Sequence, residues 1–268
     1  MTKLLVPVLV LALAAVALPG GVVAHVGTRL GESNAKDEPM SLHRTQCGEV
    51  YAVDGFSRTV PANHSWGHPE IGSAPWEVTF GGSDLDLWSV ENGMAKARTT
   101  PMASSGQRVP AARDIEMQAR FSLGTLTRGS SVSTGFFARF RRVGGPVGDH
   151  VRMRVRTKTG RFLVSVSRVV GGVTTSTEEK DAGLASPNVW FWRCFKVVDD
   201  TIQGKLWRNR KVEPAWLAKM RHPAIATMVQ TDAGIRNTYT PGPMFPTIHY
   251  DDFRVSAPAC PVGPNDIR

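Results

Sequence analysis

The sequence lacks several patterns that mark common classes of protein. It has three cysteines and no Cys-x-x-Cys pair, so a metal site built on paired cysteines is not indicated. An apolar stripe at helical spacing is missing almost throughout, and only residues 214–220 could form a turn or two of helix. There is also no internal repeat and no interior linker. Since 41% of the residues are hydrophobic, we expect a single domain with a sizeable core rather than a disordered chain.

The long apolar run of the chain lies at its N-terminus. Lys3 precedes apolar residues 4–18, and a Val-Val-Ala triplet at 22–24 precedes His25. This pattern is typical of a secretory signal peptide, so residues 1–24 are predicted to direct export. An uncleaved anchor is the alternative, although the run falls just short of a membrane span. Nothing later approaches a span, so we expect a secreted, extracellular protein with no integral membrane segment after processing.

Export changes how the cysteines are interpreted, because disulfides persist outside the reducing cytosol. Cys47 opens the ordered part of the mature chain and Cys260 closes it, whereas Cys194 lies inside a hydrophobic run. We therefore predict a disulfide between Cys47 and Cys260, with Cys194 left as a buried thiol. Pairing of either with Cys194 is the alternative. The predicted bridge would stabilise the fold by about 4 to 5 kcal/mol, because it restricts the unfolded chain.

The chain is basic, with a net charge of +9, or +8 once Lys3 leaves with the signal peptide. A basic exported protein suits anionic polymers such as acidic or cell-wall polysaccharide, and nucleic acid is not an expected partner outside the cell. Basic surfaces are also a common solubility device. Charge alone therefore favours a cell-envelope glycan as partner without deciding it, and it leaves the oligomeric state open.

The mature chain reads as a series of short strands. Residues 25–46 lack periodicity and are expected to be a flexible leader, and residues 261–268 a C-terminal tail. From about residue 48, apolar and polar residues alternate in short segments, most clearly at 114–123. In a second clear run, valine and methionine alternate with Arg152, Arg154 and Arg156. A short turn that contains glycine follows, and after it apolar residues again occupy every second position. Two such runs joined by a short turn predict a β-hairpin.

Other predicted strands make the total about a dozen. They cover residues 76–80, 85–90, 93–99, 134–142, 189–198, 202–208, 226–237 and 247–256. The segment 189–198 is apolar on both faces, as expected of a central strand packed on both sides. Many short strands with regular turns predict a two-sheet, antiparallel jelly-roll sandwich over residues 47–260.

Three stretches resemble successive signatures of a concanavalin A-like, laminin-G-like jelly-roll module of exported actinobacterial and phage tail proteins. They are residues 55–78, 138–172 and 248–258, and the matching positions are Phe56, Arg58, Trp66, Gly67, Trp76, the hairpin 152–172 and residues 251–255. The resemblance implies an all-β, concanavalin A-like fold. It implies less about function, because this sandwich carries lectins, adhesion modules, glycan hydrolases, lyases and structural modules. The flanking cysteines and the Pro-rich stretch 239–247 depart from the pattern.

No catalytic residues are assigned from the sequence. Acid and base cleavage of glycans uses two carboxylates, but a Glu-x-Asp-x-Glu strand is absent, and Asp84 with Asp86 is an isolated pair. A polysaccharide lyase would use cations to neutralise a uronate and a His or Tyr to move a proton. The arginine hairpin together with His249 and Tyr250 supplies those residue types.

The aromatic residues favour binding. A sugar ring packs its C–H groups on an aromatic face while flanking polar groups contact its hydroxyls. Trp66 and Trp76 are expected in the core. If the concave face of the sandwich is open, the candidate ligand-binding platform consists of Trp192, Trp207, Tyr250, Arg152 and Arg154.

A structural calcium ion is the one cofactor considered. In many sandwich modules an acidic residue of the last strand joins the start of the first strand to hold calcium, which takes oxygen ligands. Asp54 and Asp252 are the candidate ligands here. No Asp-x-Asp-x-Asp-Gly loop accompanies them.

The sequence thus ranks three functions. The leading hypothesis is an exported, non-enzymatic glycan-binding or adhesion module at the cell envelope or in the medium. The first alternative is a polysaccharide-degrading, lyase-like enzyme acting on an acidic polymer. The second is a structural component of a surface or tail-like assembly.

Overall fold

The computed structural model describes residues 48–62, 65–80, 88–98, 104–125, 131–142, 148–240 and 246–259. These residues form sixteen β-strands and one short helix, α1 (Pro223–Ala226), so the all-β prediction is confirmed. Within them, no helix is long and apolar enough to cross a membrane. The predicted signal peptide, leader and tail lie at 1–46 and 261–268, outside the described residues, and stay predictions.

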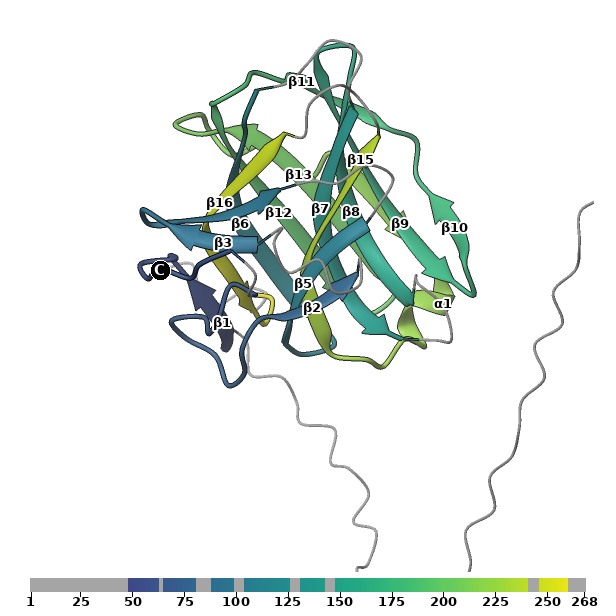
Figure 1. The fold of residues 1–268 in the computed structure, drawn as a ribbon. Coiled ribbons are helices and arrows are strands. Elements are labelled where there is room, and N and C mark those ends of the chain that lie inside the picture. Colours follow the sequence, from purple (N-terminus) through teal and green to yellow (C-terminus); the bar gives the residue numbers. More distant parts are fainter. Residues whose placement is uncertain are drawn as a thin grey trace, which may run out of the picture. The chain divides into compact units, whose positions relative to one another are not determined.

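The strands pair into two antiparallel sheets. Sheet A contains β1 (Val50–Asp54), β3 (Trp88–Glu91), β4 (Met94–Arg98), β6 (Ile115–Leu123), β12 (Trp190–Val198), β13 (Thr201–Arg208), β14 (Ala218–Arg221) and β16 (Thr247–Ser256). Sheet B contains β2 (Glu77–Phe80), β5 (Ser104–Pro110), β7 (Ser131–Arg141), β8 (Asp149–Lys158), β9 (Arg161–Val170), β10 (Val173–Ser176), β11 (Lys180–Leu184) and β15 (Asp232–Thr240). Figure 1 shows these strands, with α1 as a small helical segment at one side.

The strand order is that of a jelly roll rather than a simple meander. Sheet A runs β14-β13-β12-β6-β16-β4-β3, with β1 paired to β16. Sheet B runs β10-β9-β8-β7-β15-β5-β2, with β11 paired to β9. In each sheet a strand late in the sequence lies between two early ones: β16 beside β4 and β6, and β15 beside β5 and β7. These crossovers bring residues distant in sequence onto common faces.

Alternation along the strands builds the core between the sheets. In β6, Ile115, Met117 and Phe121 are buried, whereas Glu116 and Arg120 on the other face stay half-exposed. Such period-two burial is what a sheet with one packed face requires. The predicted core positions Trp66 and Trp76 are fully buried, and their rings meet edge-to-face with centroids 5.1 Å apart.

The predicted arginine hairpin is confirmed. β8 and β9 pair along their length, and Thr159 and Gly160 join them with positive φ angles of 48° and 74°. Two consecutive residues with positive φ give the turn geometry that matches the twist of a two-strand hairpin. Because the valines and Met153 of β8 face the core, the three arginines of β8 lie on the outer face of sheet B.

Two expectations about local structure are wrong. Residues 218–221 form β14 rather than helix, and α1 follows instead, because Pro223 suits a first helical turn and His222 Nδ1 accepts a hydrogen bond from Ala224 N. Strand β12 is not packed on both faces. Phe191 and Phe195 face the core, but Trp190 and Trp192 on the other face remain half-exposed.

Candidate functional site

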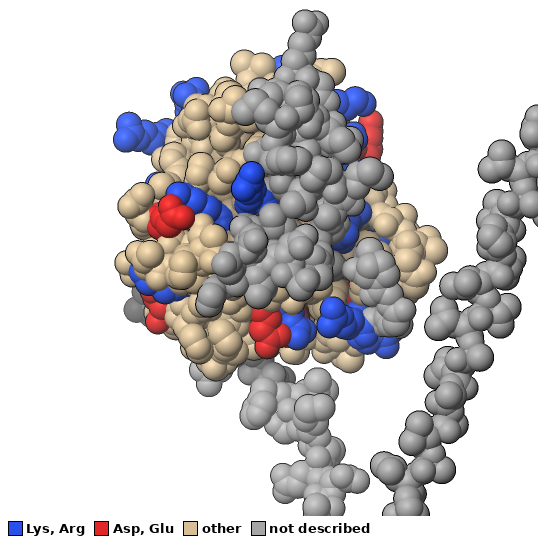
Figure 2. All heavy atoms as spheres, viewed as in Figure 1, with Lys and Arg blue, Asp and Glu red and all other residues tan. Residues whose placement is uncertain are grey.

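The outer face of sheet B carries a groove of about 230 Å³. Arg152, Arg154 and Arg156 of β8 line it on one side, and Arg236 of β15 lies on the other. Hydroxyl groups of Ser131 and Ser133 on β7 and Thr238 on β15 complete the polar lining. We call this feature the arginine groove. Over the face drawn in Figure 2, Lys and Arg side chains are likewise more widespread than Asp and Glu.

Gly135 lies in the floor of the arginine groove. Gly135 of β7 is paired with Arg154 on one side and with Arg236 on the other, so the two arginines flank a position without a side chain. A Cβ atom at Gly135 would lie 1.9 Å from the carbonyl oxygen of Met153, so no side chain fits at this position. The floor therefore consists of backbone, which leaves the space above it to a ligand.

The lining of the arginine groove is cationic. The described lining residues include four arginines and no carboxylate. Glu179, next to the groove, binds Arg154 and Arg156 at 2.7 and 2.5 Å. Arg152 Nε donates a hydrogen bond of 2.9 Å to Ser167 Oγ. Burial and the neighbouring Arg154 lower the pKa of Arg152 to about 10, and burial with Arg152 lowers the pKa of Arg236 to about 10. Both groups stay charged at neutral pH.

His150 lies buried at one end of the same face. Its Nδ1 is 2.7 Å from the carbonyl oxygen of Gly148, and its Nε2 is 3.2 Å from Arg236 Nη1. Because Arg236 can only donate, Nε2 accepts that hydrogen bond and Nδ1–H donates to Gly148. Burial and then the charge of Arg236 lower the pKa of His150 to about 3. The imidazole is therefore neutral and positions Arg236.

A different surface covers the outer face of sheet A. Trp192 of β12 and Trp207 of β13 are register partners, with ring centroids 6.3 Å apart and planes 18° apart. Arg120 Cζ lies 5.7 Å from the Trp192 ring and 5.4 Å from the Trp190 ring. Lys205 Nζ lies 5.9 Å from the Trp207 ring and 4.1 Å from the ring of Trp216. We call these four tryptophans with Arg120 and Lys205 the indole ladder.

The structure does not bring the five predicted platform residues together. Arg152 and Arg154 line the arginine groove on sheet B, whereas Trp192 and Trp207 belong to the indole ladder on sheet A. Tyr250 is on neither surface. It points inward from β16, is 0% exposed, and its hydroxyl is hydrogen-bonded to Thr134 and Asn237. One shared platform is therefore wrong, because alternation along β16 turns Tyr250 into the core.

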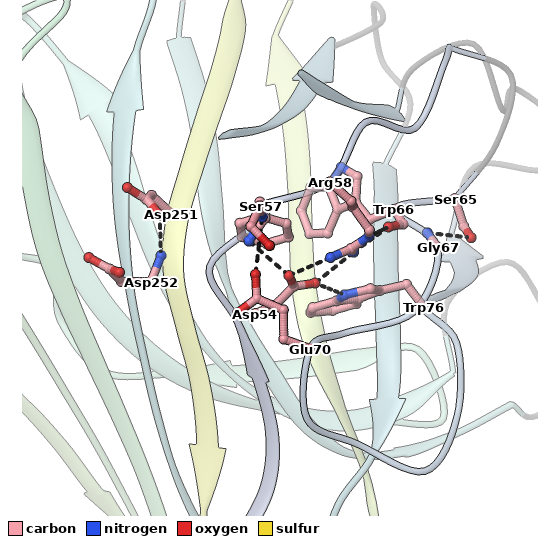
Figure 3. Close-up of polar contacts among 11 residues, drawn as sticks. Asp54, Ser57, Arg58, Ser65, Trp66, Gly67, Glu70, Trp76, Asp251 and Asp252 are labelled. Carbon is pink, nitrogen blue, oxygen red and sulfur yellow. Dashed lines mark hydrogen bonds and ion pairs between the residues drawn. The ribbon is translucent and has the colours of Figure 1, made fainter. Parts of the chain in front are cut away.

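The two candidate calcium ligands do not fit a calcium site. The buried Asp54 carboxylate accepts four hydrogen bonds, two from the Arg58 guanidinium at 2.7 and 2.8 Å, one from Trp76 Nε1 at 2.7 Å and one from Phe56 N at 2.9 Å. Asp252 instead binds Arg120 Nε at 2.6 Å, and Figure 3 shows it apart from the Asp54 cluster. Described Asp, Glu, His and Cys residues form no group of three that could hold a metal. Asp54 thus holds a loop in place, and both of its carboxylate oxygens already accept hydrogen bonds from the protein.

Of the cysteines, Cys194 is described, and it is a free, buried thiol. Its Sγ lies 3.4 Å from Glu116 Oε1, and burial raises the pKa of the thiol. Cys47 and Cys260 lie outside the described residues, so their disulfide stays a prediction. Gly48 and Pro258, which lie one residue from Cys47 and two residues from Cys260, are joined by a 3.4 Å backbone hydrogen bond.

Comparison with known proteins was made by sequence and by structure. No family model and no curated protein matches the sequence. Among solved structures, the CBM2 module of the evolved Dit protein of Lactobacillus casei BL23 phage J-1 aligns with a TM-score of 0.54 and 10% identity, covering 79% of this chain and 96% of that one. A pseudo β-1,3-glucanase of Mycobacterium tuberculosis aligns with a TM-score of 0.51 and 12% identity, over 78% and 99%.

A third solved structure comes from work on endo-acting O-glycanases that members of the human gut microbiota express to initiate mucin breakdown. It aligns with a TM-score of 0.53 and 11% identity, covering 78% of this chain and all of that one. The fold is a concanavalin A-like jelly-roll sandwich. At these identities the likeness establishes the fold alone, and structures that share it include both a carbohydrate-binding module and glycan-cleaving enzymes.

Sequence reasoning missed several residues of both surfaces. Arg236 and His150 were not selected for the arginine groove, nor Arg120 and Lys205 for the indole ladder. The available signal was the interior strand glycine Gly135, because glycine inside a strand often marks a close backbone approach. The pairing of β7 with β15 was needed to place Arg236 beside it.

Proposed function

We propose that the protein is an exported, non-enzymatic glycan-binding module, acting at the cell envelope or in the medium, and that its arginine groove binds acidic polysaccharide. The observation that carries the proposal is the cationic lining above a floor of glycine backbone. A guanidinium presents paired N–H donors that match a carboxylate or sulfate. The lining hydroxyls add donors and acceptors suited to sugar hydroxyls.

The arginine groove offers little for hydrolysis. Glycoside hydrolysis by acid and base requires two carboxyl groups on either side of the scissile bond. The described lining of the groove has none, and the nearby Glu179 is bound to Arg154 and Arg156. Glu179 therefore supports the arginine side chains rather than presenting a free carboxyl group to substrate.

Lyase chemistry is the second candidate, since arginines that neutralise a uronate are one of its requirements. Its other requirement is a group that moves the proton. Of the two candidates named from sequence, Tyr250 is buried between the sheets with its pKa raised by burial, and His249 lies on the outer face of sheet A, away from the groove. His150, on the groove face, has both ring nitrogens engaged and a pKa of about 3. None of the three is available to a chain lying in the groove, which favours binding over cleavage.

Affinity electrophoresis and calorimetry with a polyuronate test the proposal. We expect wild-type protein to bind polygalacturonate or alginate, more weakly as salt rises, because exposed charges are screened. Arg152→Gln and Arg154→Gln should each weaken binding by roughly tenfold, which corresponds to about 1.4 kcal/mol for a lost charge-assisted contact. The matched control is Arg161→Gln, which removes the same charge from an exposed arginine of β9 that pairs with Asp181.

The outcomes separate the three functions. Retention without new products, lost in the groove variants but not in Arg161→Gln, supports the module. Unsaturated sugar ends in the product would replace it with the lyase. Failure to bind any acidic polysaccharide would overturn the proposal and leave a structural role in a surface assembly as the better reading.

A further inference from the structure

The indole ladder is a second surface with chemistry unlike that of the arginine groove. The protein has seven tryptophans, all of them described, and three are fully buried: Trp66, Trp76 and Trp88. The other four all belong to the ladder and are half-exposed. Every solvent-accessible indole ring of this protein is thus placed in one cluster on the outer side of sheet A.

The register of sheet A aligns the rings in a row across the strands. Trp207, Trp192 and Arg120 are register partners on the neighbouring strands β13, β12 and β6. Trp190, two residues from Trp192 on β12, lies on the same face, so Arg120 contacts both rings. Lys205 lies two residues before Trp207 and joins it to Trp216. The cations hold the indoles in place while each ring keeps part of its surface in solvent.

The charges of the indole ladder are already neutralised. Arg120 forms ion pairs with Asp251 and Asp252, and Lys205 pairs with Glu213. Trp192 Nε1 donates a 3.1 Å hydrogen bond to Asn209. Cations that already have carboxylate partners would add little to the binding free energy of a polyanion. An uncharged ligand with apolar C–H faces and hydroxyl edges matches rings that are bordered by paired polar groups.

The surface is also unlike a typical protein interface core, which is a contiguous apolar patch depleted of charge. None of the large apolar side chains that are most exposed in the described part of the chain is among the residues of the indole ladder: Ile71, Val170, Val173, Leu184, Val212 and Val229. Only Val212 is near the ladder in sequence, because it precedes Glu213, the partner of Lys205. Rings separated by ion pairs suit a sugar chain better than the hydrophobic centre of a protein partner.

We infer that the indole ladder is a second binding site, separate from the arginine groove, that takes the pyranose faces of an uncharged polysaccharide. The two sites lie on the outer faces of different sheets. A protein that carries both contacts an acidic chain and an uncharged chain at once. It would link two kinds of glycan without acting on either.

Affinity electrophoresis with hydroxyethyl cellulose, xyloglucan and galactomannan tests this inference. We expect wild-type protein to be retarded by at least one of them, with no dependence on salt. Trp192→Ala and Trp207→Ala should each weaken that binding roughly tenfold or more, and Trp207→Phe should restore part of it because a flat ring remains. Arg152→Gln changes the arginine groove instead, and it should leave binding of the uncharged polysaccharide unchanged.

A second readout needs no variant. Because the remaining three tryptophans are buried, acrylamide quenching of fluorescence reports on the indole ladder. The uncharged polysaccharide should reduce quenching, whereas polyuronate should not. Absence of retardation, or unaltered binding by folded Trp192→Ala and Trp207→Ala, would overturn the inference while the groove proposal stands. A wild-type dimer that Trp207→Ala makes monomeric would also overturn it, because the face would then be a contact between copies of the chain.

Discussion

The two outer faces of the sandwich are built by the same alternation and yet differ in almost every chemical respect. On sheet B, the outward positions around the arginine groove are arginine, serine and glycine, and the surface is hollow. On sheet A, the outward positions of the indole ladder are tryptophans and charged residues, and the surface is filled. The inward positions of both sheets are mostly apolar, apart from a buried polar cluster that includes Arg193, Thr134 and Asn237. The fold therefore decides which residues reach a face, and the identity of those residues decides what the face can bind.

Charge compensation differs in the same way. In the arginine groove Glu179 is shared between Arg154 and Arg156, and Arg152 makes its described hydrogen bond to a serine. In the indole ladder Arg120 alone has two carboxylate partners. One face thus keeps an excess of positive potential for an anionic ligand, and the other face does not. Salt should separate the two kinds of binding.

The largest effect should come from filling the floor of the groove. In Gly135→Ala the new methyl group would lie 1.9 Å from the Met153 carbonyl oxygen, so β7 and β8 must move apart. We expect a loss of about 3 kcal/mol in the free energy of unfolding, measured by urea titration. Trp192→Ala removes a half-exposed ring on the other face and should cost only about 1 kcal/mol. If the two variants had the same free energy of unfolding, the proposed difference would be wrong: that backbone forms the floor of the arginine groove, whereas side chains form the surface of the indole ladder.

An effect confined to acid pH concerns the buried imidazole of the groove face. The pKa of His150 is about 3 in the folded protein, against an ordinary value of 6.5, because of burial and the charge of Arg236. Between these values the unfolded chain binds more protons than the folded one. Stability should therefore be complete above about pH 6.5 and fall as the pH drops toward 3, by up to about 1.4 kcal/mol per pH unit.

Paired variants isolate that contribution. His150→Gln should flatten the pH dependence of the unfolding free energy between about pH 6.5 and 4.5, where carboxylates contribute little. His249→Gln is the control on sheet A, where half-burial and Lys96 also lower the pKa but the ring retains more contact with solvent. It should change the slope less. An unchanged slope in His150→Gln would show that the groove face holds no buried neutral imidazole.

Calcium is expected to have no effect on the melting temperature. The Asp54 oxygens accept hydrogen bonds from donors that include an arginine, and Asp252 is bound to Arg120 of the indole ladder. The melting temperature should be the same in calcium and in a chelator. A rise of several degrees with calcium would mean that a site outside these two residues binds it.

Much of the fold could be predicted because its signals are local. Period-two alternation gave β6, β8 and β9, and the burial of Trp66 and Trp76 followed from their place in a motif. Strands with weak alternation were missed: β1, β5, β10, β11 and β14. Of these, β10 is four residues long and fully exposed, so it carries no apolar face to detect.

The candidate sites were less accessible to prediction, because they depend on pairing between distant segments. Choosing Trp192 and Arg152 from sequence was reasonable for each residue, but nothing local says that β12 and β8 belong to different sheets. Arg236 reaches the groove only because β15 pairs with β7. Tyr250 shows the opposite error, since an aromatic residue with polar neighbours at 249 and 251 was assigned outward when its strand alternation turns it inward.

The pairing of β1 with β16 has a mechanical consequence. Val50 is the partner of Ser256, so the two ends of the described sandwich meet at the same end of one antiparallel pair. Tension applied through those ends would break the β1–β16 hydrogen bonds one after another, in an unzipping geometry. A shear geometry would instead load all of these hydrogen bonds at once. A covalent bridge between Cys47 and Cys260 would carry that load in their place. Under traction the arginine groove and the indole ladder would then keep their shape, because neither lies between the two points where the force is applied.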